Sequence, residues 1–559
     1  MVVTAVGPES PIRARQMSEP LSADFVVVGS GICGALAAML LAQRGASVIM
    51  LEAGPRVGRA QLLANFRNSP RRSDWMSPYP FSPWAPHPVY LPEANEHLLQ
   101  AGPYPYPAEY IRMVGGTTWH WAALAWRYLP SDLEMFSRYG VGVDWPFDYA
   151  QLEPYYQWAE ELIGVAGAEE EHPESPRQKP YPMQPVAEPW AMRRIRERLD
   201  GTYRVANNPV ARNSRTFGHR PACCGSNNCQ PICPVDAQYH GGISVAAAEA
   251  AGVRLIANAV VYHLEHDDQD RIVAAHFHDP ERNSYRITGN TFVVAANGIE
   301  TPRLLLMSTS ERFPNGIANS ADTVGRYLMD HPSTSLTFDA DEDLWLGRGP
   351  QSPSSISALR DGAFRAERSA YRLDFTNISR VDSTTRRLLQ EGVYGAEFER
   401  RLRHSAAREM SVKTVLEVLP RPENRITLSG KKDALGLPRP QAHYAIDDYT
   451  RGGALDAKQH FTRIAQLMGG SNLRFTADDD FANNQHICGT VRIGDDPATS
   501  VCDSWGRTHD HDNLFLVGTG LLPTAGTCNS TLTAIAVALR SVDAMLPVAA
   551  PSAAGQGRS

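Results

Sequence analysis

Residues 24–34 read DFVVVGSGICG, and the expected fold follows from this stretch. After Asp24 the residues are apolar and mostly β-branched, which is typical of a buried strand. Gly29, Gly31 and Gly34 follow at the spacing Gly-x-Gly-x-x-Gly, and a run rich in Ala, Leu and Met comes next. The stretch therefore predicts a strand, a tight glycine turn and a helix in immediate succession.

The residues beyond this turn complete a βαβ unit. We expect the helix to run to about Arg44, because Gly45 suits the position just after a helix end. Residues 47–51 form a second apolar strand, and Glu52 follows it about twenty positions after the glycine turn. This order of strand, glycine turn, helix, strand and acid is the sequence fingerprint of a dinucleotide-binding fold.

Each position of the fingerprint has a mechanical role. Gly29 allows the tight turn, Gly31 lets the backbone approach a pyrophosphate, and Gly34 lets the helix pack closely on the strand. The helix N-terminus offers free N–H groups to the phosphates, and Glu52 can accept hydrogen bonds from ribose hydroxyls. The other strands of the fold come hundreds of residues later, which favours the FAD domain of a flavoprotein over an NAD domain.

Composition excludes several classes of protein. The 559 residues carry 54 basic and 61 acidic side chains, and this net charge of −7 argues against nucleic acid or an anionic membrane as a charge-bound partner. The longest apolar run, residues 32–42, is too short to span a membrane. The first twenty-odd residues lack the apolar core of a secretory signal, and no Cys-x-x-Cys-His haem motif occurs.

Three further segments carry a resemblance to a known family. Residues 114–121 (VGGTTWHW), residues 297–306 (NGIETPRLLL) and a C-terminal pair, His486 and Asn529, resemble the signatures of the glucose–methanol–choline (GMC) oxidoreductases. The likeness extends from about residue 24 to residue 545. It implies an α/β fold of mixed α+β character, in which a Rossmann-like FAD-binding domain is interrupted by a substrate domain with an antiparallel sheet.

The domain organisation expected from these features has five parts. They are a flexible N-terminal arm (1–22), a mainly FAD-binding region (23–330), a mainly substrate-binding region (331–480), a C-terminal return to the FAD domain (481–546) and a flexible tail (547–559).

The resemblance implies roles for individual residues. His486 would accept the proton of the substrate hydroxyl, because histidine titrates near working pH, and Asn529 would hold that hydroxyl. FAD would be bound without a covalent bond, although His120 is the nearest residue to the position where distant relatives attach it. Besides the fingerprint residues, we expect the cofactor to contact Gly115, Gly116, Thr118, His120, Trp121, Val260, Gly518 and Thr531.

Four of the eight cysteines cluster in residues 223–234, which read CCGSNNCQPICP. Thiolates suit iron, and the ending Cys-x-x-x-Cys-Pro is found in ferredoxins. The resemblance implies that Cys223, Cys229 and Cys233 bind a three-iron (3Fe-4S) cluster, while the role of Cys224 stays open. A structural zinc site, completed by Cys224, His219 or His240, and a disulfide are the alternatives.

Within the family, the glycine loop and the cysteines together resemble the catalytic subunits of bacterial FAD-dependent glucose dehydrogenases. Sorbitol, gluconate and fructose dehydrogenase flavoprotein subunits and glucoside 3-dehydrogenases are close relatives. The resemblance implies oxidation of a sugar alcohol, glucose C1 to the lactone first of all, with sorbitol, gluconate or glycoside C3 as alternatives. An electron-transfer flavoprotein without an alcohol site and an oxygen-using oxidase are rival interpretations.

Partners and location are implied by the same resemblance. A small subunit that carries the export signal and a membrane cytochrome c subunit would accompany the chain at the periplasmic face of the inner membrane, with a cytoplasmic enzyme as the alternative. Two other histidine patterns receive no role in the chemistry. We interpret His331 as structural, and His509 and His511 as solvated surface residues.

Overall fold

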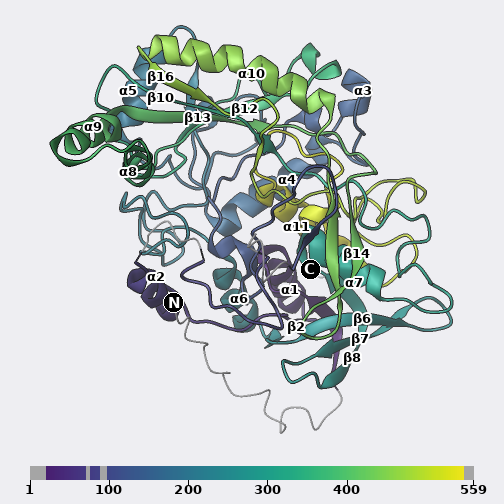
Figure 1. The fold of residues 1–559 in the computed structure, drawn as a ribbon. Helices are drawn as coiled ribbons and strands as arrows, with labels where there is room; N and C mark the ends of the chain where they lie inside the picture. The colour runs from purple at the N-terminus through teal and green to yellow at the C-terminus, as the bar shows by residue number, and fades with distance from the viewer. Residues whose placement is uncertain (1–20, 71–75, 89–96, 547–559) are drawn as a thin grey trace, which may run out of the picture.

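The computed structural model describes residues 21–70, 76–88 and 97–546 (Figure 1). Its helices are α1 Ile32–Gln43, α2 Arg59–Asn68, α3 Met135–Tyr139, α4 Tyr149–Ile163, α5 Trp190–Leu199, α6 Gly241–Ala250, α7 Asn297–Met307, α8 Val381–Gln390, α9 Gly395–Arg408, α10 Asp448–Leu467 and α11 Thr531–Met545. Over these residues, no helix combines the length and the apolar character needed to cross a membrane.

A seven-stranded sheet forms the first layer, in the order β5-β2-β1-β8-β7-β6, with β18 also pairing with β8. Its strands are β1 Leu21–Val28, β2 Val48–Leu51, β5 Arg254–Ile256, β6 Val260–His266, β7 Ile272–His278, β8 Ser284–Val294 and β18 Leu514–Leu516. Helices α6, α1, α11 and α4 pack one on the next beside this sheet. The predicted strand, glycine turn, helix and strand are thus confirmed as β1, residues 29–31, α1 and β2.

Parallel pairing brings distant segments to one edge of this sheet. Val28 is in register with Leu51 and Val294, and Val294 is in register with Leu516. Four strand ends from three distant parts of the chain therefore lie side by side. In open α/β sheets the crevice outside these carboxyl ends is where ligands bind.

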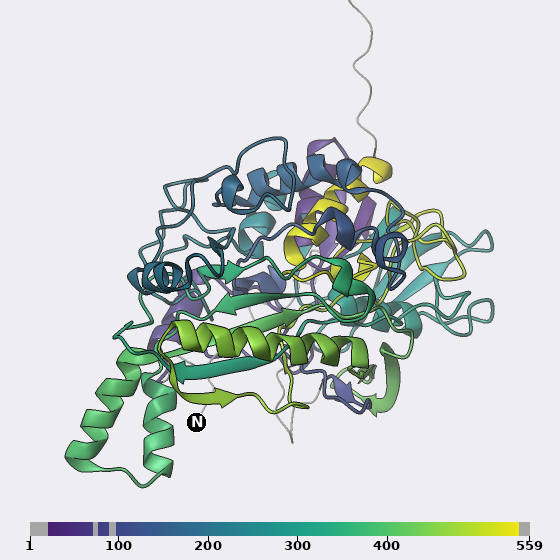
Figure 2. The same cartoon turned by 90° about the horizontal axis from the view of Figure 1, so that it is seen from above.

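A six-stranded antiparallel sheet forms the second layer, in the order β16-β10-β13-β12-β11-β4. Its strands are β16 Ser471–Phe475, β10 Ser335–Asp339, β13 Glu409–Leu416, β12 Tyr371–Phe375, β11 Ser354–Ile356 and β4 Val205–Asn207. Helix α10 packs on β10 and β13, and the α8–α9 hairpin stands away from the body of the molecule (Figure 2). The expected fold class is confirmed, with an antiparallel sheet that also recruits β4 from outside residues 331–480.

Smaller elements connect the two layers. They are the three-stranded sheet β14-β15-β3 (β14 Arg425–Lys432, β15 Pro438–His443, β3 Leu99–Gln100) and the pair β17-β9 (β17 Ala482–Asn483, β9 Pro332–Ser333). Helix α7 contacts β6, β14 and β15 and so joins the first layer to this small sheet.

Candidate active site

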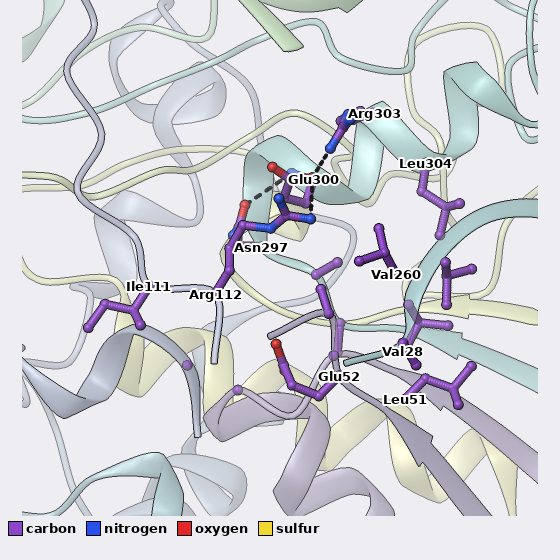
Figure 3. Close-up of a pocket in the computed structure, with 18 of the residues that line it drawn as sticks. Val28, Leu51, Glu52, Ile111, Arg112, Val260, Asn297, Glu300, Arg303 and Leu304 are labelled. Atoms are coloured by element: carbon purple, nitrogen blue, oxygen red, sulfur yellow. Dashed lines mark hydrogen bonds and ion pairs between the residues drawn. The ribbon is translucent and has the colours of Figure 1, made fainter. Parts of the chain in front are cut away.

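A cavity lies at the carboxyl ends of the parallel strands of the first sheet (Figure 3). Of the predicted cofactor residues, Gly29, Gly31, Glu52, Gly116 and Val260 line it. Its other walls come from loops that follow the same strand ends and from α7. They include Arg112, Ala295, Asn297, Glu300 and Arg303.

The glycines around this cavity allow a tight turn and let the protein backbone come close to a bound ligand. Gly29 has φ +104°, and a Cβ there would lie 2.5 Å from the backbone oxygen of Ala295. A Cβ on Gly34 would lie 2.2 Å from the Gly29 oxygen, so Gly34 shapes the turn without lining the cavity. A Cβ on Gly31 would meet nothing within 4 Å and would occupy the cavity itself.

The donors at this edge suit a diphosphate. Helix α1 begins after Gly31 without any side-chain cap, so the N–H groups of its first turn are available to an anion. Arg112 is buried, and its Nη1 has no hydrogen-bond partner among the described residues. The Glu300 carboxylate lies between Arg112 and Arg303, at 3.8 Å and 3.0 Å. These residues fit the pyrophosphate of FAD.

Glu52 is buried at the end of β2, as the fingerprint predicts. Its carboxylate accepts hydrogen bonds from the Ser30 backbone N–H at 3.0 Å, the Ser30 hydroxyl at 2.6 Å and the Gly54 N–H at 3.0 Å. These bonds hold the carboxylate at the cavity wall, where lone pairs remain for a ribose.

A second cavity of about 590 Å³ adjoins the first, and Gly31, Thr117, Ala295 and Asn297 line both. Most of the remaining predicted residues line this one: Thr118, His120, Trp121, Gly518, Thr531, His486 and Asn529. Gly115 lines neither cavity; its N–H contacts the Ser30 hydroxyl at 3.2 Å. Apart from Gly34 and Gly115, the predicted cofactor and catalytic residues thus line two adjoining cavities.

The predicted catalytic pair is in direct contact. The Asn529 side-chain nitrogen lies 2.7 Å from His486 Nε2, although 43 positions separate the two residues in sequence. Burial lowers the pKa of His486 well below 6.5, and His331, Arg372 and Lys413 lower it further. The ring is therefore neutral at pH 7 and has a nitrogen lone pair that can accept a proton.

The loop that carries His486 is clamped by the buried carboxylate of Asp330. Its two oxygens accept backbone N–H bonds from His331 at 2.6 Å, His486 at 2.8 Å and Gln485 at 3.1 Å. Burial raises the pKa of Asp330 to about 6, although these N–H groups act in the opposite direction. His331, predicted to be structural, lies with its Nδ1 2.9 Å from His486 Nδ1.

The antiparallel sheet contributes charged groups to the second cavity. On β12, Arg372 forms an ion pair with Asp374 at 2.6 Å, and Arg372 also reaches the Asn529 side-chain oxygen at 3.2 Å. Lys413 on β13 is opposite Asp374 in register and donates to Asn484 at 2.8 Å. Burial lowers the pKa of Lys413. Such closely placed donors and acceptors suit a polyhydroxylated substrate.

The cysteine loop packs against the wall of the second cavity. Gln230 lines that cavity, and Gln238 bonds both the Trp121 oxygen at 2.7 Å and the Cys229 oxygen at 3.2 Å. The Gly225 N–H lies 3.4 Å from Cys223 Sγ, as expected of a loop that stabilises thiolates through backbone donors. All eight cysteines lie in the described residues as free thiols, so the disulfide alternative is not seen.

The zinc alternative fits the loop less well. A closed zinc site with Zn–S bonds of about 2.3 Å brings its sulfurs within about 4 Å of one another. Within the described ranges, three ligand atoms of His, Cys, Asp or Glu lie within 4.8 Å of one another only at Asp330, His331 and His486, where all take part in hydrogen bonds. His240 bonds Asp236 at 3.0 Å and stacks on Trp119. Among the described residues, the cysteine loop therefore contains no preformed zinc site.

One histidine prediction is wrong. His511 is buried rather than solvated: its Nε2 accepts from the Ala318 N–H at 3.1 Å, and its Nδ1 lies 2.6 Å from the Asp270 oxygen. The polar character of the turn around His511 thus reflects hydrogen bonds inside the protein rather than exposure to solvent.

Sequence reasoning missed many polar residues of the two cavities. Among them are Arg112, Arg372, Asp374, Lys413 and Asn484. Arg112 stands two positions before the 114–121 loop, which was a usable signal. The other four are placed by strand register and by contacts of the 482–485 segment, which no motif marks.

Two protein-family models and several known proteins are similar to this chain. A family model described as GMC oxidoreductase matches residues 420–538, and one described as FAD dependent oxidoreductase matches residues 24–161. The chain is 45% identical to the fructose dehydrogenase large subunit of Gluconobacter japonicus, over 95% of this chain and 98% of that protein. It is 29% identical to the paromamine 6'-oxidase of Streptomyces fradiae, over 93% and 91% of the two chains.

Among solved structures, a formate oxidase superposes with a TM-score of 0.65 at 13% identity and covers 94% of this chain and 98% of its own. This likeness concerns the fold alone. Taken with the matching family models and the 45% identity along nearly the whole length, it leads to one assignment: the chain belongs to the GMC oxidoreductase family of FAD-dependent enzymes.

Proposed function

We propose that this chain is the flavoprotein subunit of a dehydrogenase that oxidises an alcohol group of a sugar, with a free hexose as the first substrate class. The observation that carries the proposal is the contact of His486 with Asn529 in a polar cavity that adjoins the cofactor cavity. The 45% relative is named for fructose, whereas the glycine loop and the cysteines resemble glucose dehydrogenases. We therefore propose fructose and glucose as the first candidate substrates, ahead of sorbitol, gluconate and glycosides.

The reaction removes a proton and a hydride from one carbinol group. His486 accepts the hydroxyl proton at Nε2, and Asn529 donates a hydrogen bond to the same oxygen, so that the hydroxyl is held in a reactive pose. FAD, when bound, supplies the acceptor for the hydride and its two electrons, and the substrate leaves as a carbonyl compound. Gly31, the first turn of α1 and Arg112 would hold its pyrophosphate, and Glu52 its ribose.

The positive charges beside the pair assist proton removal. Arg372 and Lys413 lie close enough to lower the pKa of His486, which keeps the ring unprotonated between turnovers. The same charges favour an oxygen that becomes negative as its proton leaves. Asp374 balances part of this charge through its ion pair with Arg372.

Electrons then need an exit. We infer that Cys223, Cys229 and Cys233 hold an iron–sulfur cluster, which when bound would pass electrons singly to a separate protein. The loop fits because it is rich in free thiols, offers a backbone N–H to sulfur and contacts the cavity wall. The relative's designation as a large subunit supports a heteromeric enzyme. A small export subunit and a membrane cytochrome c at the periplasmic face are the partners we propose.

An anaerobic assay tests the function. Purified protein with FAD is mixed with fructose, glucose, sorbitol, gluconate or methyl glucoside, and flavin bleaching is followed with and without an artificial acceptor. We expect rapid bleaching with one hexose and slow reaction of the reduced enzyme with dioxygen. Fast reoxidation by dioxygen would point to the oxidase alternative, and bleaching by none of these compounds would reject the substrate class.

A further inference from the structure

The catalytic pair belongs to a continuous row of hydrogen-bonded side chains. Arg372 Nη2 lies 3.2 Å from Asn529 Oδ1, and Asn529 Nδ2 lies 2.7 Å from His486 Nε2. His486 Nδ1 lies 2.9 Å from His331 Nδ1. At the far end, His331 Nε2 lies 3.0 and 3.1 Å from the backbone oxygens of residues 525 and 526. The row thus runs without a break from a guanidinium to two carbonyl groups.

The two ends of the row determine where every hydrogen lies. A backbone oxygen can only accept, so His331 Nε2 carries a hydrogen and His331 Nδ1, in a neutral ring, is an acceptor. His486 Nδ1 must then carry the hydrogen between the two rings, which leaves the lone pair of His486 on Nε2. From the other end, a guanidinium can only donate, so Arg372 orients the oxygen of Asn529 toward itself and the amide nitrogen toward His486. Both ends lead to the same assignment.

The surroundings keep both rings neutral. His331 and Arg372 are completely buried. Burial, together with the positive charge of Arg372, lowers the pKa of His331 to about 4. The other charged or titratable groups that line the second cavity or contact the loop of His486 are Cys33, Glu109, Tyr110, His120, Asp330, Arg372, Asp374 and Lys413. Asp330 accepts only backbone N–H groups, so it does not compete for the ring hydrogens.

We propose that His331 and Arg372 are positioning residues, which together hold His486 in the tautomer whose lone pair is on Nε2, beside Asn529. This rests on the proposed role of His486 as the base. A neutral imidazole can carry its hydrogen on either nitrogen, and the wrong tautomer offers an N–H where the substrate needs an acceptor. In serine proteases, holding the catalytic histidine in the wrong tautomer costs about 10⁴ in kcat.

Matched substitutions at residue 331 separate this role from a purely structural one. His331→Asn keeps an acceptor near the position of Nδ1 but loses the bond to the two backbone oxygens. His331→Gln keeps a donor near the position of Nε2 but loses the acceptor for His486. We expect His331→Asn to reduce flavin within a few-fold of the wild-type rate, and His331→Gln to be about ten- to hundred-fold slower, in kcat more than in KM. The opposite order would overturn the proposal, because it would mean that the bond to the backbone is what matters.

A matched pair of substitutions at residue 372 tests the other end of the row. Arg372→Lys keeps a donor for the Asn529 oxygen, whereas Arg372→Met removes it and lets the amide turn over. We expect Arg372→Lys to retain more of the wild-type kcat than Arg372→Met, and equal losses in the two variants would overturn the positioning role of Arg372. His511→Asn, at a buried histidine outside both cavities, is the control for general loss of packing and should leave the rate of flavin reduction unchanged.

A spectroscopic measurement tests the tautomer without any turnover. In protein labelled with ¹⁵N-histidine, two-bond ¹H–¹⁵N spectra identify which ring nitrogen is protonated, and the His486 signals are those that His486→Gln removes. We expect a protonated Nδ1 and an unprotonated Nε2 in the wild type and in His331→Asn, and a loss of this preference in His331→Gln. A hydrogen on Nε2 in the wild type would refute the assignment. If the tautomer is as expected but His486→Gln reduces flavin normally, the proposed function fails instead.

Discussion

The side-chain amide of Gln230 donates a hydrogen bond to the backbone oxygen of His120, with 2.8 Å between nitrogen and oxygen. Gln230 stands beside Cys229 in the cysteine loop, and His120 belongs to the loop that lines the second cavity. The cysteine loop is therefore hydrogen-bonded to the wall of the second cavity. This contact supports the proposal that the loop takes electrons away from the flavin.

Replacing Cys223, Cys229 or Cys233 by Ser should leave substrate-driven flavin reduction intact but slow electron transfer to a one-electron acceptor protein. The reason is that the loop would lose a ligand, whereas the catalytic pair would not change. Anaerobically purified protein should contain iron and acid-labile sulfide, and the variants should lose both. Cys502→Ser, at a buried cysteine elsewhere, is the control. Zinc without iron in the wild-type protein would end this interpretation.

Gly31→Ala should fold normally but bind FAD at least about tenfold more weakly, because the added methyl group would occupy the cavity where the backbone must approach the pyrophosphate. Thermal unfolding of the apoprotein and FAD titration measure the two effects. Gly430→Ala, where a Cβ also meets nothing within 4 Å, is the control and should bind FAD as the wild type does. FAD that remained with acid-precipitated protein would contradict non-covalent binding.

His486→Ala should slow flavin reduction by about 10²- to 10⁴-fold, since it removes the group that accepts the hydroxyl proton. Stopped-flow bleaching at saturating substrate gives the rate, and the flavin spectrum shows whether FAD stays bound. His404→Ala, at an exposed histidine on α9, should reduce flavin at the wild-type rate. A near-normal rate in His486→Ala would remove this residue from the role of base.

The rate of flavin reduction should be constant at neutral and higher pH and fall below about pH 6. The pKa of Asp330 lies at about 6, so this carboxylate takes a proton there and loses part of its hold on the His486 loop. The pKa of His486 lies well below 6.5, so the ring stays unprotonated to lower pH. Asp330→Asn should therefore lower the rate but remove the fall near pH 6. An unchanged pH profile in this variant would assign the fall to another group.

Arg365→Ala should destabilise the fold by about 3–5 kcal/mol, the usual cost of removing one partner of a buried ion pair and leaving the opposite charge unpaired. Arg365 contacts both Glu417 and Asp132, and all three side chains are fully buried. Chemical unfolding of the apoprotein measures the change. Asp382→Ala, in an exposed pair with Arg386, should cost no more than about 0.5 kcal/mol.

The parts of the fold set by local sequence could be predicted, and those set by pairing between distant strands could not. The glycine turn and Glu52 are local features, and His486 and Asn529 were found because they resemble family signatures. Arg372 and Lys413 reach the cavity only through the register of β12 and β13. Nor could helix α10 be predicted from an apolar stripe, because its buried side includes small or polar residues such as Thr450, Gly453 and Ala457.

The pairing of β18 with β8 also has a consequence for the order of folding. β18 pairs with β8 at the edge where the cofactor cavity lies, and His486 and Asn529 flank β18 in the sequence. Contacts between such distant segments form late, because the chain must first lose the conformational entropy of a long loop before these contacts can stabilise it. We therefore expect a nascent chain to remain unable to complete its cofactor site until more than 500 residues have been synthesised. During that interval the exposed edge of β8 would be open to mispairing, and a chaperone that covers it would raise the yield of active protein.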